Sequence, residues 1–286
     1  MQCCNGDVKS RLKWKVSLEE VPAEEVRMEK KKVLRFILIY LLSGIVFFLL
    51  TIPFHKVLAV FTVTEVRPSA VLYPVLGISF GLPAALGIMT ANCICDAMNG
   101  FSPAVLIEGL IPQLLYTMVP YYLWRRLTNG EGHKHRLDSA VRVLKYALVC
   151  LVFSLLSALG VGVLLYVNYH FDPTQAALFV LLNNFFTSVV LGCPLMIVIN
   201  QIVSRRTGAD RTLTRNEIII IITSAVQVIL VAGAAAAIYA GGKTIGTYDI
   251  WNTIYIIGIV LIGITMPVSL VCMVLFGKKE KNSSGQ

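Results

Sequence analysis

Residues 77–100 read GISFGLPAALGIMTANCICDAMNG, an apolar segment rich in glycine and alanine that ends on polar residues. With residues 69–76 it forms an apolar run of about thirty residues, which is too long for one ordinary membrane span. Pro83 has no backbone N–H and biases the residue before it away from helix, so we expect the run to divide at Gly81–Pro83. The stretch therefore predicts two short helices, Ser69–Phe80 and Leu82–Met98.

The composition of the whole chain places it in a lipid bilayer. Of 286 residues, 56% are hydrophobic and 14% are charged, whereas roughly 25% are charged in an average soluble domain. The mean hydropathy is +0.74. Six further segments have the length of about 20 mostly apolar residues that a membrane helix requires. They are Val33–Phe54, Ser102–Trp124, Ala140–Val167, Thr174–Val203, Asn216–Ala240 and Ile250–Gly277.

The basic residues indicate eight membrane helices with both termini in the cytoplasm. Lys and Arg concentrate in short cytoplasmic loops. With this topology all but three of the 25 Lys and Arg residues lie inside, the exceptions being Lys56, Arg67 and Lys243. A single span over residues 69–99 would reverse every later loop. The formal charge of +9 is thus a signal of topology and of contact with membrane lipids, and no soluble domain presents a basic face to nucleic acid.

The predicted fold is an all-α integral membrane protein with a six-helix body and two further transmembrane helices. Residues 1–32 form a cytoplasmic N-terminal segment and residues 33–203 the six-helix membrane domain. Residues 204–277 hold the two additional helices, and residues 278–286 form a cytoplasmic tail.

Polar side chains of separate segments are predicted to lie at similar depth, near the outer side of the six-helix body. These are Arg67, Asn92, Asp96, Glu108, Asn183 and Asn184. Ionisable groups inside a membrane are costly and face a cavity or a partner. A few polar groups between apolar walls are typical of a small-molecule pocket, here open to the outside. The alternative is structural: Asp96 pairs with Arg67, and the asparagines join helices at about 0.6 kcal/mol each.

The sequence carries no pattern of a catalytic or metal site. It contains no HExxH motif, no carboxylate pair at metal-ligand spacing and no Walker motif. His133 and His135 are interpreted as part of a solvated cytoplasmic loop, and His170 and Asp172 as part of an outer turn without a nucleophile. We therefore expect no enzymatic activity, no metal and no cofactor, so that any use of ATP belongs to another subunit.

Two motifs carry a resemblance to a known family. Residues 66–100, VRPSAVLYPVLGISFGLPAALGIMTANCICDAMNG, and residues 121–127, YYLWRRL, resemble the substrate-binding S components of energy-coupling factor (ECF) transporters. The similar features are Arg67-Pro68 before a short helix, the glycine-proline turn, and Asp96 followed by Gly100. The resemblance spans Val33–Val203 and agrees with the six-helix core of that family.

The resemblance implies a role in uptake. S components capture a vitamin, metal or other micronutrient from outside, and a membrane scaffold with two cytoplasmic ATPases drives import. It places Glu65–Pro68 in a lid loop and makes Asn92, Asp96, Glu108, Asn183 and Asn184 candidate lining residues. The chain departs from the family in two ways. Its first helix carries only Ser43 and Gly44 as small residues, where members have alanines spaced by four, and it has two extra helices.

The expected function is high-affinity binding of a small, vitamin-like solute, as a subunit of an ATP-driven uptake system in a prokaryotic plasma membrane. Two alternatives act without the ATPase module. One is a membrane sensor that signals through residues 1–32. The other is a proton-coupled carrier that uses Asp96 or Glu108, because buried carboxylates suit proton relays.

Overall fold

The computed structural model of the chain describes residues 23–52, 59–61, 64–65, 68–129, 136–170, 173–206 and 212–241. The predicted last helix, Ile250–Gly277, and the predicted tail lie outside these residues. The chain divides into two units, Met1–Phe36 and Ile37–Gln286. The first unit contains the beginning of helix α1 (Ala23–Thr51), where Lys32 Nζ lies 2.8 Å from Glu29 Oε1 on the surface.

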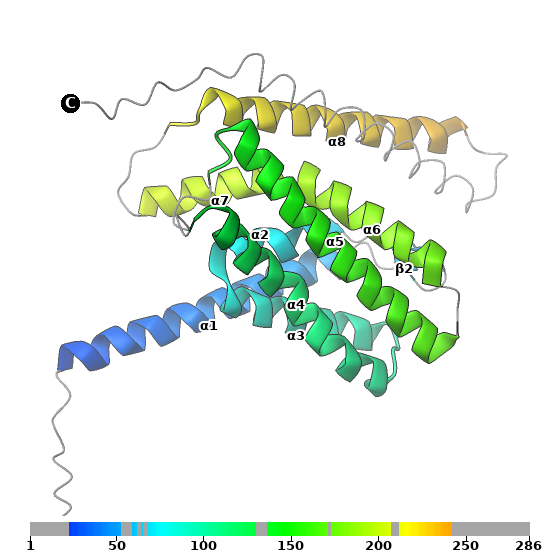
Figure 1. Cartoon of the computed structure of the whole chain (residues 1–286), viewed down its shortest axis with the longest axis horizontal. Helices are drawn as coiled ribbons and strands as arrows, with labels where there is room; N and C mark the ends of the chain where they lie inside the picture. Colours follow the sequence, from blue (N-terminus) through cyan, green and yellow to red (C-terminus); the bar gives the residue numbers. More distant parts are fainter. Residues whose placement is uncertain are drawn as a thin grey trace, which may run out of the picture. The chain divides into compact units, whose positions relative to one another are not determined.

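The described residues are predominantly helical (Figure 1). After α1 come α2 (Leu72–Phe80), α3 (Leu82–Met98), α4 (Pro103–Leu127), α5 (Ala140–Tyr169), α6 (Pro173–Val190), α7 (Gly192–Arg206) and α8 (Arg215–Gly241). A short antiparallel ribbon pairs β1 (Ala59–Phe61) with β2 (Thr64–Glu65), and a 3₁₀ turn, Pro68–Val71, precedes α2.

Within the residues that the structure describes, four helices are long and apolar enough to cross a membrane. By length and composition these are Arg27–Thr51, Pro103–Leu127, Ala140–Asn168 and Pro173–Val190. The prediction of a helical, multi-pass membrane protein is confirmed at this level.

The Gly-Leu-Pro hinge lies where the sequence predicts it. Gly81 ends α2 and begins α3, with its N–H donating to Gly77 O at 2.8 Å and its carbonyl accepting from Ala85 N at 3.1 Å. Its φ of +64° lies in the left-handed region, which glycine adopts without the strain that a Cβ would cause. Pro83 fits the first turn of α3, where no N–H is needed. The apolar run is therefore two short helices, as expected.

Helix α2 lies at the centre of the hydrophobic core. Every residue from Leu72 to Ile78 is buried, in agreement with the rule that a helix that is apolar all round is buried. It contacts α3, α4, α5, α6 and α7. A Cβ on Gly77 would collide with the carbonyl oxygen of Thr117 in α4, so this glycine permits a close approach of the two helices.

A second close approach joins α1 to α3. A Cβ on Gly87 would collide with the carbonyl oxygen of Tyr40, and one on Gly44 would lie 3.1 Å from the carbonyl oxygen of Gly87. The Tyr40 hydroxyl donates to Thr90 Oγ1 at 3.1 Å beside this contact. Ser43 is also buried, at 5% exposed. The small residues of α1 therefore serve packing within the protein.

Replacing Gly87 by alanine is expected to destabilise the protein by about 1–3 kcal/mol, because the colliding atoms are backbone and α1 must move. The control is Gly162→Ala, whose Cβ would meet only Pro173 Cβ at 3.5 Å and Ala177 Cβ at 3.6 Å, ordinary contacts. Thermal unfolding in detergent measures both variants. Equal melting temperatures for the two variants would contradict the role of Gly87.

The predicted single helix Thr174–Val203 is wrong at its middle, because the chain forms α6 and α7 with a break at Leu191. Pro194 cannot donate to the carbonyl of Val190, and its ring crowds that carbonyl. The Tyr146 hydroxyl donates to the Ser188 carbonyl at 3.1 Å next to this break.

Polar contacts join the end of α4 to α5 and the start of α8 to the segment before α5. Lys145 Nζ donates to the carbonyl of Leu127 at 2.7 Å, and Asn216 Nδ2 donates to the carbonyl of Asp138 at 2.6 Å. Glu217 accepts from Thr214 N at 3.0 Å, which caps the first turn of α8. The predicted helix Asn216–Ala240 is thus present as α8 and is joined to the body by polar contacts.

Candidate ligand-binding site

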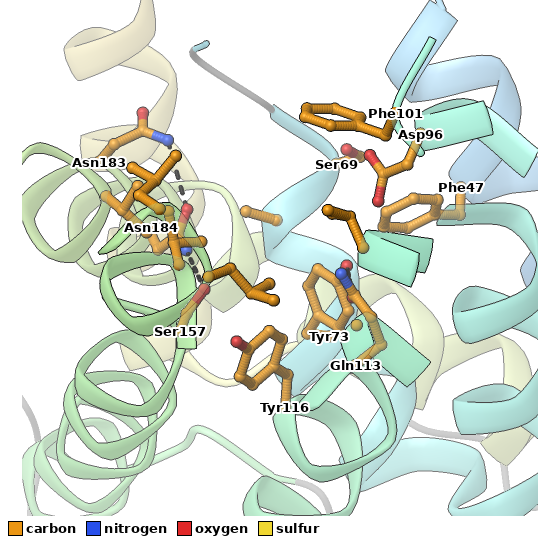
Figure 2. Close-up of a pocket in the computed structure, with 17 residues that line it drawn as sticks. Phe47, Ser69, Tyr73, Asp96, Phe101, Gln113, Tyr116, Ser157, Asn183 and Asn184 are labelled. Carbon is orange, nitrogen blue, oxygen red and sulfur yellow. Dashed lines mark hydrogen bonds between the residues drawn. The ribbon is translucent and has the colours of Figure 1, made fainter. Parts of the chain in front are cut away.

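A cavity of about 150 Å³ lies within the second unit of the chain (Figure 2). On the same measure a single water molecule requires roughly 10–15 Å³, so the cavity has the size for a small organic molecule. The lining residues come from α1, the 3₁₀ turn, α2 to α6 and the turn between α3 and α4. They are Phe47, Ser69, Ala70, Tyr73, Asp96, Phe101, Val105, Gly109, Gln113, Tyr116, Ser157, Val161, Leu164, Leu165, Val180, Asn183 and Asn184.

Helix α4 contributes one face to the cavity. Its lining residues Val105, Gly109, Gln113 and Tyr116 are spaced by four, four and three, which places them on one side of a helix. The opposite face of α4 carries exposed apolar side chains such as Ile111, which is 71% exposed. The helix therefore separates the cavity from the surface expected to face lipid.

Helices α5 and α6 pack along each other and close the other side. On α5 the lining residues are Ser157, Val161, Leu164 and Leu165, again one helical face. The lining residues of α4 lie mostly in its N-terminal half and those of α5 in its C-terminal half. The cavity therefore lies toward the end of the body that contains the α3–α4 and α5–α6 turns.

Aromatic rings form one wall of the cavity. The Tyr73 ring stacks on Phe153 at 5.5 Å between centroids and meets Phe47 edge-on at 5.4 Å. Tyr116 meets Tyr73 edge-on at 6.0 Å. A Cβ on Gly160 would collide with the Tyr116 hydroxyl, so the glycine allows this side chain to pack against α5. These contacts hold the rings in defined positions.

Asp96 supplies the carboxylate of the cavity. Figure 2 shows it on one side, together with Ser69, Phe101 and Phe47. Its Oδ2 accepts from Asn92 Nδ2 at 2.6 Å, one helical turn earlier on α3. Asn92 is 1% exposed and does not line the cavity. The asparagine therefore positions the carboxylate from behind.

A chain of amides and a hydroxyl lies on the opposite side of the cavity (Figure 2). Asn183 Nδ2 donates to Asn184 Oδ1 at 3.3 Å, and Asn184 Nδ2 donates to Ser157 Oγ at 2.8 Å. All three residues are less than 9% exposed. Near the aromatic wall, the Tyr73 hydroxyl donates to Gln113 Oε1.

The arrangement suits a flat, polar molecule. Aromatic rings stack on planar ligands, while the carboxylate accepts hydrogen bonds from N–H groups on one side and the Ser157 chain offers polar groups on the other. The residues lining this cavity in the described part of the chain include one carboxylate and neither Lys nor Arg. In the same part of the chain, no group of three or more His, Cys, Asp or Glu is arranged to hold a metal ion.

The structure brings together three of the six predicted site residues. Asp96, Asn183 and Asn184 line the cavity. Arg67 lies outside the described residues. Glu108 is exposed and does not line the cavity, because it lies on the neighbouring face of α4, where its Oε2 accepts from Asn168 Nδ2 of α5 at 2.9 Å.

Several lining residues were not predicted from the sequence. Serine is common in apolar helices, so Ser157 does not stand out in the sequence. Gly109 is one of many small residues. Phe47 and Phe101 carry no polar signal at all. The helical spacing of Gly109 with Gln113 and Tyr116 is the pattern in the sequence that points to a shared face.

A comparison with known protein families agrees with the resemblance to S components. The family model described as QueT transporter matches residues 38–201, more than half of the chain, and every lining residue lies within this range. No match to a curated protein or to a solved structure was found. The matched range also covers the motifs that resemble S components. The chain therefore belongs to the QueT transporter family, which comprises substrate-binding S components of ECF transporters.

Proposed function

We propose that this protein captures a queuosine precursor and delivers it to an ATP-driven importer. QueT transporters are S components for queuosine precursors. These precursors share the 7-deazaguanine ring, which is planar and carries N–H donors and a carbonyl on one edge. We infer that the free base is the ligand.

The observation that carries the proposal is the composition of the cavity. A carboxylate lies across from an amide and hydroxyl chain, with aromatic rings between them. Isolated bases are bound by stacking on aromatic side chains and by hydrogen bonds to their edges. Asp96 is suited to accept from the N–H groups of a guanine-type edge. A phosphorylated nucleotide fits poorly, because no basic side chain of the described residues lines the cavity.

The proposed topology has a six-helix body, two C-terminal helices and both termini in the cytoplasm. The basic ends of α4 and α5, with Arg125, Arg126 and Arg142, then lie inside, and the cavity lies toward the outside. The partners are an ECF membrane scaffold and its ATPases in a prokaryotic plasma membrane.

The test is ligand binding by purified protein in detergent or nanodiscs. A ligand that binds only the native state stabilises it by about 2.7 kcal/mol at a hundredfold excess over Kd. We expect 7-deazaguanine bases to raise the melting temperature, and adenine and guanosine monophosphate to leave it unchanged. If the folded protein shows no change in melting temperature with any 7-deazaguanine base, the proposed ligand is refuted.

A further inference from the structure

Gly109 is a helix residue whose lack of a side chain is not explained by packing. It lies within α4, where glycine costs about 1 kcal/mol relative to alanine. A Cβ on Gly109 would meet no atom within 4 Å. In contrast, a Cβ on Gly77, Gly87 or Gly160 would collide with a neighbour. Gly109 also has no positive φ that would require glycine.

The open space next to Gly109 belongs to the cavity. Gly109 shares one face of α4 with Val105, Gln113 and Tyr116, all of which line the cavity. The exposed side chains of α4, including Ile107 and Ile111, lie on a different face. A side chain at position 109 would therefore extend into the cavity.

Two contacts between α4 and α5 locate the wall opposite Gly109. Glu108 accepts from Asn168 at one end, and Tyr116 seats against Gly160 at the other. The α5 segment between these contacts contributes Val161, Leu164 and Leu165 to the lining. The space beside Gly109 therefore faces aliphatic side chains.

We propose that Gly109 forms an apolar subsite that accepts an uncharged substituent of the ligand ring and sets the size limit for that substituent. This inference rests on the proposed function and names the part of the ligand involved. Under it, the substituent at C7 of a 7-deazaguanine lies in the space that a larger residue would fill. Gly109 is thus a residue that determines specificity through its missing side chain.

The experiment compares 7-deazaguanine with 7-cyano-7-deazaguanine, which adds an uncharged group of two heavy atoms. Equilibrium binding is measured for wild type, Gly109→Ala and Gly109→Val. Because small changes in an apolar pocket alter binding by about 10–200-fold, we expect Gly109→Val to weaken binding of the cyano base about 100-fold, and Gly109→Ala about tenfold. Binding of the unsubstituted base falls by less than about threefold in both variants.

Thermal unfolding without ligand separates binding from folding. The melting temperature of both Gly109 variants should equal or exceed that of wild type, since the added atoms meet open space and alanine favours helix. The matched control, Gly162→Ala on α5, lies outside the cavity lining and should bind both bases as wild type does. If Gly109→Val does not fold, Gly109→Ala alone decides the comparison.

The outcomes distinguish the two proposals. Wild type that binds neither base overturns the proposed function and the subsite with it. Wild type that binds both bases, with Gly109 variants that bind the cyano base equally well, overturns the subsite alone. Equal loss of both bases in the Gly109 variants also overturns it, because the effect would then not depend on the substituent.

Discussion

Replacing Asp96 by asparagine is expected to weaken ligand binding at least about 100-fold while the protein stays folded. The variant keeps the size of the side chain and removes the charge. Hydrogen bonds to a charged group contribute about 1.5–3 kcal/mol, and 2.7 kcal/mol corresponds to about a hundredfold in Kd. Asparagine also places an N–H₂ group where the ligand presents donors. Equilibrium binding of 7-deazaguanine to the purified variant measures the loss.

Glu108→Gln is the matched control for the Asp96 variant. Both carboxylates lie in apolar helices near the same end of the body, but Asp96 lines the cavity and Glu108 does not. Glutamine retains an oxygen that accepts from Asn168 Nδ2, so we expect the Glu108 variant to bind within about threefold of wild type. Equal losses in the two variants would indicate a general effect of membrane carboxylates rather than a contact with the ligand.

Asn92→Ala tests the positioning role inferred for Asn92. Asn92 donates to Asp96 Oδ2 at 2.6 Å without lining the cavity. Without this donor, the carboxylate still lines the cavity and loses one contact that orients it, so the loss of affinity should be smaller than in Asp96→Asn. A loss as large as that of Asp96→Asn would instead place Asn92 in contact with the ligand.

The sequence predicted best those features that depend on local backbone chemistry. Gly81 and Pro83 determine the hinge between α2 and α3 by their own conformational limits, and the hinge is where they predict it. The break at Leu191 has a similar cause in Pro194. It was missed because the apolar run continues through it, and length alone then favours one long helix.

The direction in which a side chain points around its helix axis could not be predicted from the sequence. The topology placed Asp96 and Glu108 at similar depth, but one residue along α4 separates the cavity face at Gly109 from the face of Glu108. Which face of a helix points inward depends on packing against its neighbours. The contact of Tyr116 with Gly160 helps to fix that rotation for α4 and involves residues far apart in the sequence.

Breaking the Asn183–Asn184–Ser157 chain is expected to produce the second large loss of binding. In this chain Asn184 Nδ2 occupies the acceptor side of the Ser157 hydroxyl, at 2.8 Å, and leaves the hydroxyl proton for an acceptor on the ligand. Asn184→Ala removes the group that orients Ser157, and Ser157→Ala removes the donor itself. Each should weaken binding of 7-deazaguanine about 10–50-fold, which corresponds to roughly 1.4–2.3 kcal/mol.

The double variant shows whether the two residues act as one unit. If Asn184 acts on the ligand through Ser157, the double variant should bind no more weakly than the weaker single variant, because effects within one hydrogen-bond network are not additive. Ser154→Ala is the control on the same helix, since the Ser154 hydroxyl donates to the Cys150 carbonyl at 2.7 Å and does not line the cavity. Losses that multiply in the double variant would mean that Asn184 and Ser157 contact the ligand independently. If Asn184→Ala binds the ligand normally, the hydrogen bonds among Asn183, Asn184 and Ser157 would serve only to join α5 to α6.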